Sequence, residues 1–121
     1  MSRPMTPPDQ ELARRLLAPV PYRNRYPAGR LRPPIGIMPG DVRSLPELHR
    51  FLAPDDGSLP GINLAGLPEW VDRVTGDRML ATRISEAVRD AGSYVEGCLR
   101  VYELLGERLE QARDATRSLV A

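Results

Sequence analysis

The sequence contains no lysine, a single cysteine and few aromatic side chains. All seventeen basic residues are arginine, so a Walker-type phosphate loop, which needs a lysine, is excluded. Cys98 has no partner for an intramolecular disulfide, and cysteine usage therefore gives no sign of an oxidising compartment. Aromatic residues make up 5% of the chain and are spread along it, which argues against a large aromatic core.

Long apolar runs are also absent. No segment reaches the roughly 18 apolar residues that a membrane-spanning helix needs. Residues 1–10 lack the apolar core of a signal peptide. We therefore expect a cytoplasmic protein with no membrane partner.

Proline is missing from the second half of the chain. All thirteen prolines lie between Pro4 and Pro68. Proline lacks an amide donor and clashes with the preceding helical turn, so the first half is limited to short helices and extended segments. The second half is free to be continuously helical. We divide the chain into an extended arm with one short helix, a region of two short helices and a loop, and a long helix, at residues 1–43, 44–76 and 77–121.

The arm is expected to contain one helix followed by extended chain. Thr6 can cap a helix over Pro7–Ala18, which Pro19 ends. Residues 19–39 contain six prolines, of which Pro19 is the first. Neither a helix nor a central strand is expected there, because each proline removes a donor and biases the preceding residue toward extended geometry.

Charge is distributed unevenly. Residues 12–40 carry six arginines and no acid, whereas residues 61–121 carry eight arginines and ten acids. A basic, proline-ordered segment can lie along an acidic protein surface or along a phosphate backbone. A protein surface is favoured, because no basic run is longer than the pair Arg14-Arg15 and the whole chain is not basic. The candidate arm contacts are Tyr22, Arg23, Arg25, Tyr26, Arg30 and Arg32.

Two short helices are predicted in residues 44–76. Ser44 and Glu47 form a capping box before an apolar stripe that ends at Pro54. A second helix begins at Leu67, where proline and glutamate follow in the first turn, and ends near Gly76. Residues 60–66, between the two, are expected to form a loop.

The strongest pattern is an apolar stripe at helical spacing from Ile84 to Leu119. It recurs like a coiled-coil heptad and predicts a helix over residues 77–119. Gly92 offers an alternative: a helix stop, followed by a new capping box from Ser93 to Glu96. We favour a continuous or kinked helix, because the stripe keeps its phase across Gly92. The candidate association seam consists of Val88, Val95, Cys98, Tyr102, Leu105 and Leu109.

No arrangement of side chains indicates catalysis, a cofactor or a metal site. His49 is the only histidine, and it has no second ligand at metal-binding spacing. Cys98 lies in the apolar stripe without a histidine to activate it, which is typical of a buried small side chain. The glycines match neither the dinucleotide fingerprint nor the phosphate loop. We expect no enzyme activity, no cofactor and no metal.

The fold expected from these patterns is mainly α-helical and non-globular, with short helices on a Pro/Arg-rich arm and one long amphipathic C-terminal helix. A single helix cannot bury its own stripe, so short helices of the same chain or another subunit must cover it. We predict a non-catalytic structural or assembly subunit that associates through this helix with a protein partner or a second copy, and wraps a partner with its arm. The alternatives are a nucleic-acid-binding accessory factor and a small accessory subunit of an enzyme complex.

Overall fold

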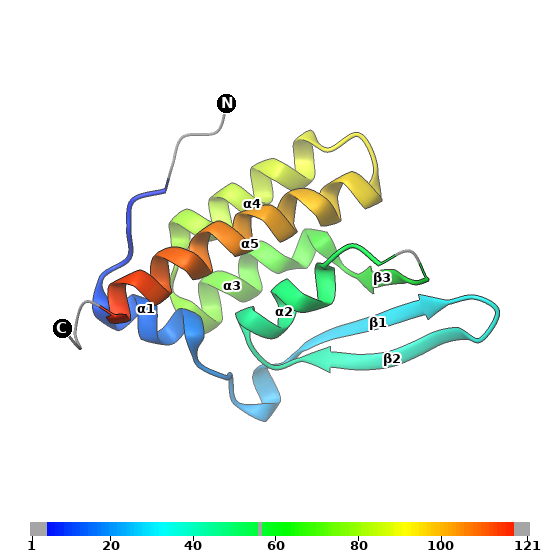
Figure 1. The fold of residues 1–121 in the computed structure, drawn as a ribbon, viewed down its shortest axis with the longest axis horizontal. Helices are drawn as coiled ribbons and strands as arrows, with labels where there is room; N and C mark the ends of the chain where they lie inside the picture. Colours follow the sequence, from blue (N-terminus) through cyan, green and yellow to red (C-terminus); the bar gives the residue numbers. More distant parts are fainter. Residues whose placement is uncertain (1–4, 56, 118–121) are drawn as a thin grey trace.

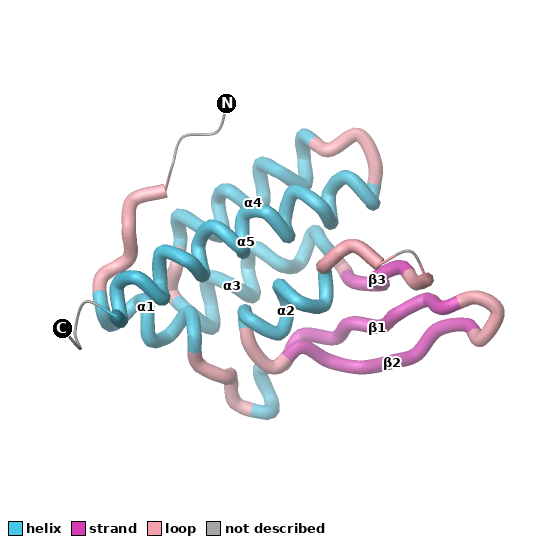
Figure 2. Tube along the Cα trace, in the orientation of Figure 1, coloured by secondary structure: helices cyan, strands magenta, loops and turns pink. Residues whose placement is uncertain are grey.

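The computed structural model describes residues 5–55 and 57–117. Within these residues it contains five α-helices, two short 3₁₀ helices and a three-stranded antiparallel sheet (Figures 1 and 2). In chain order the elements are α1 (Gln10–Leu17), η1 (Tyr22–Asn24), β1 (Tyr26–Arg32), β2 (Gly36–Val42), α2 (Leu45–Leu52), β3 (Leu59–Ile62), η2 (Leu64–Gly66), α3 (Leu67–Thr75), α4 (Arg78–Asp90) and α5 (Tyr94–Arg117).

Helix α5 is the centre of the helical layer. It packs against α1, α2 and α4, and α4 in turn packs against α3. The sheet lies at one end of this layer, where the β1–β2 hairpin projects beyond the helices (Figure 1). None of the helices in the described part of the chain combines the length and hydropathy that a membrane crossing requires. The largest fully buried side chains are Trp70, Leu16, Leu48, Leu52, Leu67, Leu80, Ile84, Leu105, Leu109, Val42, Val71 and Val101.

The prediction of an extended N-terminal arm is wrong. Residues 26–42 contain β1 and β2, and β3, at residues 59–62, overlaps the loop predicted for residues 60–66. β1 is the central strand of the order β2-β1-β3, although it contains Pro27. The absence of a central strand was therefore inferred incorrectly from the proline spacing.

The prolines of the edge strands direct their backbone nitrogens away from the sheet. The Tyr94 hydroxyl accepts a hydrogen bond from the Ile62 N–H at 2.9 Å and donates toward the Pro60 carbonyl oxygen at 2.6 Å, so these backbone groups point out of the sheet. The backbone N–H and C=O groups of successive residues point to opposite sides of an antiparallel strand. Gly61, between Pro60 and Ile62, therefore faces β1, and its partner Gly29 directs its N–H and C=O groups to β3. Its partner on β2, Pro39, then faces the free edge.

Pro27 is tolerated for a related reason. It has the same orientation as Gly29, toward β3, but the pairing with β3 covers only residues 28–31. Its missing N–H therefore removes no ladder bond. Proline spacing alone does not reveal this, because the cost of a proline in a strand depends on the pairing register.

The prediction of a continuous or kinked C-terminal helix is also wrong. The helix ends at Asp90, and α5 begins at Tyr94 and returns antiparallel to α4 (Figure 1). The alternative reading describes the turn: the Ser93 Oγ accepts from the Glu96 N–H at 3.1 Å, and the Glu96 carboxylate accepts from the Gly92 N–H at 2.6 Å. Folding back buries the apolar stripe within the same chain. Leu119, the last residue of the predicted stripe, lies outside the described residues.

The helices predicted in residues 44–76 are confirmed as α2 and α3. The Ser44 hydroxyl caps α2 by accepting from the Glu47 N–H at 3.1 Å, and α3 begins at Leu67 with Pro68 in its first turn. Helix α1 is shorter than predicted, since its N-cap is Asp9 and not Thr6. Local capping chemistry therefore located three helices to within a few residues.

Gly76 ends α3 in the left-handed region, with φ 78° and ψ 8°. An L side chain is strained there, so we expect Gly76→Ala to lower the free energy of unfolding by about 1 to 2 kcal/mol. Gly76→Asn is the matched control, because asparagine adopts this region more readily. Urea denaturation of both variants measures the difference. Equal stability of the alanine variant and the wild type would contradict the assignment.

Candidate functional site: the open face of the sheet

The two faces of the sheet differ in what covers them. Side chains alternate between faces along each strand, so Ala28 and Arg30 lie on one face while Gly29 and Leu31 lie on the other. The Arg30 guanidinium lies over the Phe51 ring of α2, 4.7 Å from its centroid, and donates to the Ser58 Oγ at 2.9 Å. The helical layer covers this face at Ala28 and Arg30, whereas Met38 on the same face is 52% exposed.

The opposite face is exposed, and we call it the open face. The register aligns Ile37, Leu31 and Leu59 in one row across the three strands. The next row on this face has Pro39 beside two glycines, Gly29 and Gly61. The open face therefore consists of Pro27, Gly29, Leu31, Ile37, Pro39, Leu59 and Gly61, together with Asp41, which pairs with Pro27 at the end farthest from Leu31.

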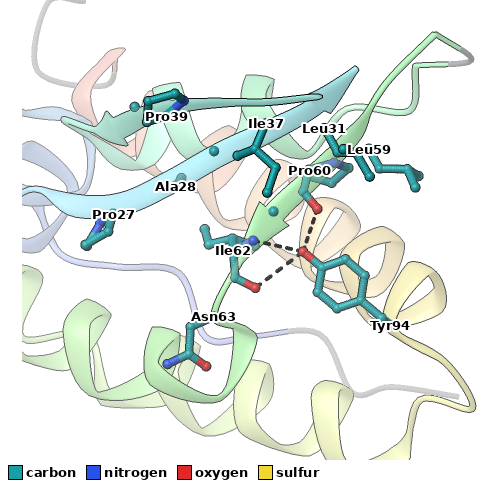
Figure 3. A pocket seen from close by; sticks show the side chains of 13 residues that line it. Pro27, Ala28, Leu31, Ile37, Pro39, Leu59, Pro60, Ile62, Asn63 and Tyr94 are labelled. Atoms are coloured by element: carbon teal, nitrogen blue, oxygen red, sulfur yellow. Dashed lines mark hydrogen bonds between the residues drawn. The ribbon is translucent and has the colours of Figure 1, made fainter. Parts of the chain in front are cut away.

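A groove of about 710 Å³ runs over the open face (Figure 3). Ile37 is 76% exposed, and Leu59 and Leu31 are 47% and 38% exposed, although all three are large aliphatic side chains. Soluble proteins seldom leave such side chains clustered in solvent without a function. The open face is accordingly the candidate interaction surface of this chain.

Tyr94 closes one end of the groove, beside the outer edge of β3 (Figure 3). Its hydroxyl satisfies the backbone groups of Pro60 and Ile62 that would otherwise face solvent. Burial raises the pKa of the Tyr94 hydroxyl above its ordinary value, so it remains a protonated donor at neutral pH. The first turn of α5 thus caps this edge against pairing with another strand.

The predicted arm contacts mostly serve the fold. Arg30 is bound to α2 and Ser58, as described above. Arg25 lies over the Tyr22 ring, 4.5 Å from its centroid, and 3.7 Å from the Asp41 carboxylate. The Tyr26 hydroxyl donates to the Asn63 carbonyl oxygen at 2.6 Å. Two predicted contacts, Arg23 and Arg32, are exposed.

The predicted association seam is divided by the fold. Cys98, Leu105 and Leu109 are buried in the core of the same chain, Val88 and Tyr102 are half-buried, and Val95 is 51% exposed. The stripe is covered by α1, α2 and α4. Burial raises the pKa of the Cys98 thiol, which disfavours the reactive thiolate.

Leu31, Ile37 and Leu59 are not among the site residues predicted from the sequence. A signal was present, because Pro27, Gly29 and Leu31 are uncharged residues spaced two apart, and so are Ile37 and Pro39. Alternation of this kind indicates one face of a strand. The proline-based exclusion of strands prevented that interpretation.

His49 packs flat against Tyr102, with ring centroids 4.5 Å apart and an angle of 4° between the planes. Burial lowers the pKa of His49 from its ordinary 6.5, and the charges of Arg113 and Arg50 lower it further. Within residues 5–55 and 57–117, no group of three or more His, Cys, Asp or Glu side chains is placed to hold a metal ion.

A pH dependence follows from the lowered pKa of His49. The folded state favours the neutral imidazole. The contribution of His49 to the free energy of unfolding is therefore complete above the unfolded pKa of about 6.5, and it is lost as the pH falls toward the folded pKa. We expect the urea concentration at the unfolding midpoint to decrease when the pH is lowered from about 7.5 to about 5.5. His49→Gln should remove that slope. Persistence of the full slope in the glutamine variant would assign it to another group.

Comparison with known proteins adds no family. No protein-family model matches the chain, and no curated protein or solved structure is significantly similar to it.

Proposed function

We propose that this chain is a non-catalytic assembly or structural subunit that binds a protein partner through the open face of its sheet. The observation that supports this most directly is the contrast between a complete helical core and an uncovered row of Ile37, Leu31 and Leu59. An apolar patch without charged side chains is typical of the centre of a protein interface. Full burial of each aliphatic side chain contributes about 1.5 to 3 kcal/mol, part of which is unrealised here.

The position of the proposed surface differs from the one expected from the sequence. Leu105 and Leu109 stabilise the fold of this chain, so a partner has no access to them without unfolding it. The hairpin, in contrast, projects from the body and is accessible from the side of the open face (Figure 1).

The nucleic-acid alternative is less well supported. Arg25 lies beside Asp41, and Arg30 is bound by Ser58 and α2, so neither is available as a phosphate contact. The Asp55 carboxylate also lies within the electrostatic influence of Arg30 and Arg32. No specific observation favours the accessory-enzyme alternative.

The variant Ile37→Asp tests the proposal. A carboxylate on the open face must be desolvated when a partner binds, so we expect at least a tenfold loss of partner retention, about 1.4 kcal/mol or more. The matched control is Met38→Asp, on the same strand but on the opposite face and 52% exposed. Both side chains are exposed in the free chain, and neither change should alter the unfolding midpoint by much.

The measurement is a pull-down from the source cells with the full chain, quantified by mass spectrometry for the wild type and both variants. A partner retained by the wild type and Met38→Asp but lost with Ile37→Asp supports the proposal. Identical retention profiles for the three proteins would refute it.

A further inference from the structure

We propose that the occupant of the open face is a single amphipathic α-helix of a partner protein, lying across the strands. This inference rests on the proposed function and names the kind of partner. Four properties of the open face support it: the shape of its groove, its blocked edges, its area and the absence of charged side chains from the groove lining.

The shape of the groove matches a helix. The glycine pair Gly29 and Gly61 forms a low floor, because neither residue carries a side chain. The row of Leu31 stands on one side of this floor and Pro27 on the other, while Tyr94 lies at the end beside β3. Pro27 and Leu31 are four residues apart on β1, or about 13 Å at roughly 3.3 Å per residue. A helix with its side chains is about 10 to 12 Å wide.

The edges of the sheet exclude an added strand. An extended peptide binds a sheet by pairing with free N–H and C=O groups of an edge strand. On β2 the outward position of Pro39 has no N–H to offer. On β3 the outward position of Pro60 likewise lacks a donor, and the Tyr94 hydroxyl occupies the remaining groups. Neither edge therefore supports a continuous ladder.

The area of the open face is too small for a second folded copy. Three strands spaced about 4.8 Å apart and up to seven residues long provide about 300 Å² of flat sheet. A stable complex between two folded proteins buries about 800 Å² on each partner. A helix of three turns, about 16 Å long, covers a surface of the size available here.

The chemistry of the groove selects an apolar helix face. The residues lining the groove include no charged side chain, and Tyr94 is the one aromatic among them. Proline-rich peptides bind grooves lined by several aromatic rings, which this surface does not offer. Apolar side chains at positions i, i+3, i+4 and i+7 of a helix present the complementary stripe.

The experiment uses two displayed peptide libraries and the full chain. One library holds amphipathic peptides of about 14 residues with high helix propensity, and the other has the same composition with two prolines at central positions. Selected peptides are synthesised, and their Kd values are measured by fluorescence polarisation. The protein variants are Ile37→Asp and Met38→Asp.

We expect peptides from the helical library to bind, with a Kd at least tenfold higher for Ile37→Asp. The Kd should change by less than about twofold for Met38→Asp, since a helix on the open face does not contact the opposite face of β2. Circular dichroism should show that the bound peptides are helical.

Two results would overturn the helix while leaving the open face as an association surface. They are selection from the proline library alone, and self-association of the chain that Ile37→Asp abolishes. The absence of any helical peptide whose binding depends on Ile37 also overturns it, even if the partner retained in the pull-down still depends on Ile37. If neither peptide nor partner binding depends on Ile37, the proposed function fails as well.

Discussion

Replacing Asp77 with asparagine is expected to lower the free energy of unfolding by about 3 to 5 kcal/mol, because it leaves a buried guanidinium without its carboxylate. The side chains of Asp77 and Arg108 are 1% and 3% exposed. The Arg108 Nε donates to the Asp77 Oδ2 at 2.7 Å, and a second guanidinium nitrogen lies 3.2 Å from the Asp77 Oδ1. Guanidine denaturation measures the loss.

This ion pair connects segments that are distant in the sequence. Arg108 also donates to the carbonyl oxygen of Thr6 at 2.6 Å, and Gln111 donates to that of Met5 at 2.7 Å. Asp77 additionally caps α4 by accepting from the Leu80 N–H at 3.0 Å. Asparagine can keep that cap, so Asp77→Asn isolates the charge interaction from the capping interaction.

The exposed pair Arg100 and Glu96 is the matched control. Its atoms are also 2.7 Å apart, but the side chains are 42% and 41% exposed, so Arg100→Met should cost no more than about 1 kcal/mol. The double variant Asp77→Asn with Arg108→Met should recover part of the loss, because it removes the unpaired charge. A single Asp77→Asn variant no less stable than Arg100→Met would contradict the buried pair.

Truncation of Leu105 to alanine is the second change with a large expected effect, about 2 to 5 kcal/mol. Leu105 is 0% exposed and belongs to the core cluster that contains Leu16, Leu48 and Ile84. The cavity left by the truncation cannot close fully, because the interior is packed by helices from three directions. Natural domains are stable by about 5 to 15 kcal/mol, so this loss is a large fraction of the total.

Val95→Ala provides the comparison on the same helix. Both side chains belong to the apolar stripe predicted from the sequence, but Val95 is exposed, so its truncation should change stability by no more than about 0.5 kcal/mol. Urea denaturation of the two variants measures the two losses in the free energy of unfolding. Losses of similar size would mean that α5 does not bury its stripe against the same chain.

The burial of Leu105 also affects how association is tested. A charged substitution there would disrupt the fold, and any loss of a partner would follow from unfolding. Ile37 and Met38 are exposed in the free chain and lie on opposite faces of β2, so they separate binding from stability.

The sequence contained strong local signals for α2 and α3. A hydroxyl at Ser44 followed by Glu47, and Pro68 in a first helical turn, act over three or four residues and need no tertiary contact. The same kind of signal was visible at Ser93 and Glu96. It was outweighed by a stripe whose phase is continuous across Gly92, although the turn there places Val88 and Val95 in different surroundings.

The sheet and the open face could not be read in the same way. Whether a proline is compatible with a strand depends on which backbone nitrogens face a neighbour, and that depends on the pairing of residues 26–32 with residues 36–42 and 59–62. The buried pair of Asp77 and Arg108 likewise joins residues 31 positions apart. Neither the pairing register nor the contact between Asp77 and Arg108 leaves a periodic trace in the sequence, although alternation along residues 27–31 indicates the face of a strand.

The sequence alone determined where the helices of residues 44–76 begin and end, through composition and helix caps. It also determined, through apolar spacing, that a large apolar stripe must be covered. These properties arise within a few turns of the chain. Tertiary structure alone decided what covers the stripe, which strands pair and which apolar side chains remain exposed. The reason is physical: burial and pairing are properties of contacts between distant segments, and they select among conformations that local preferences leave equally open.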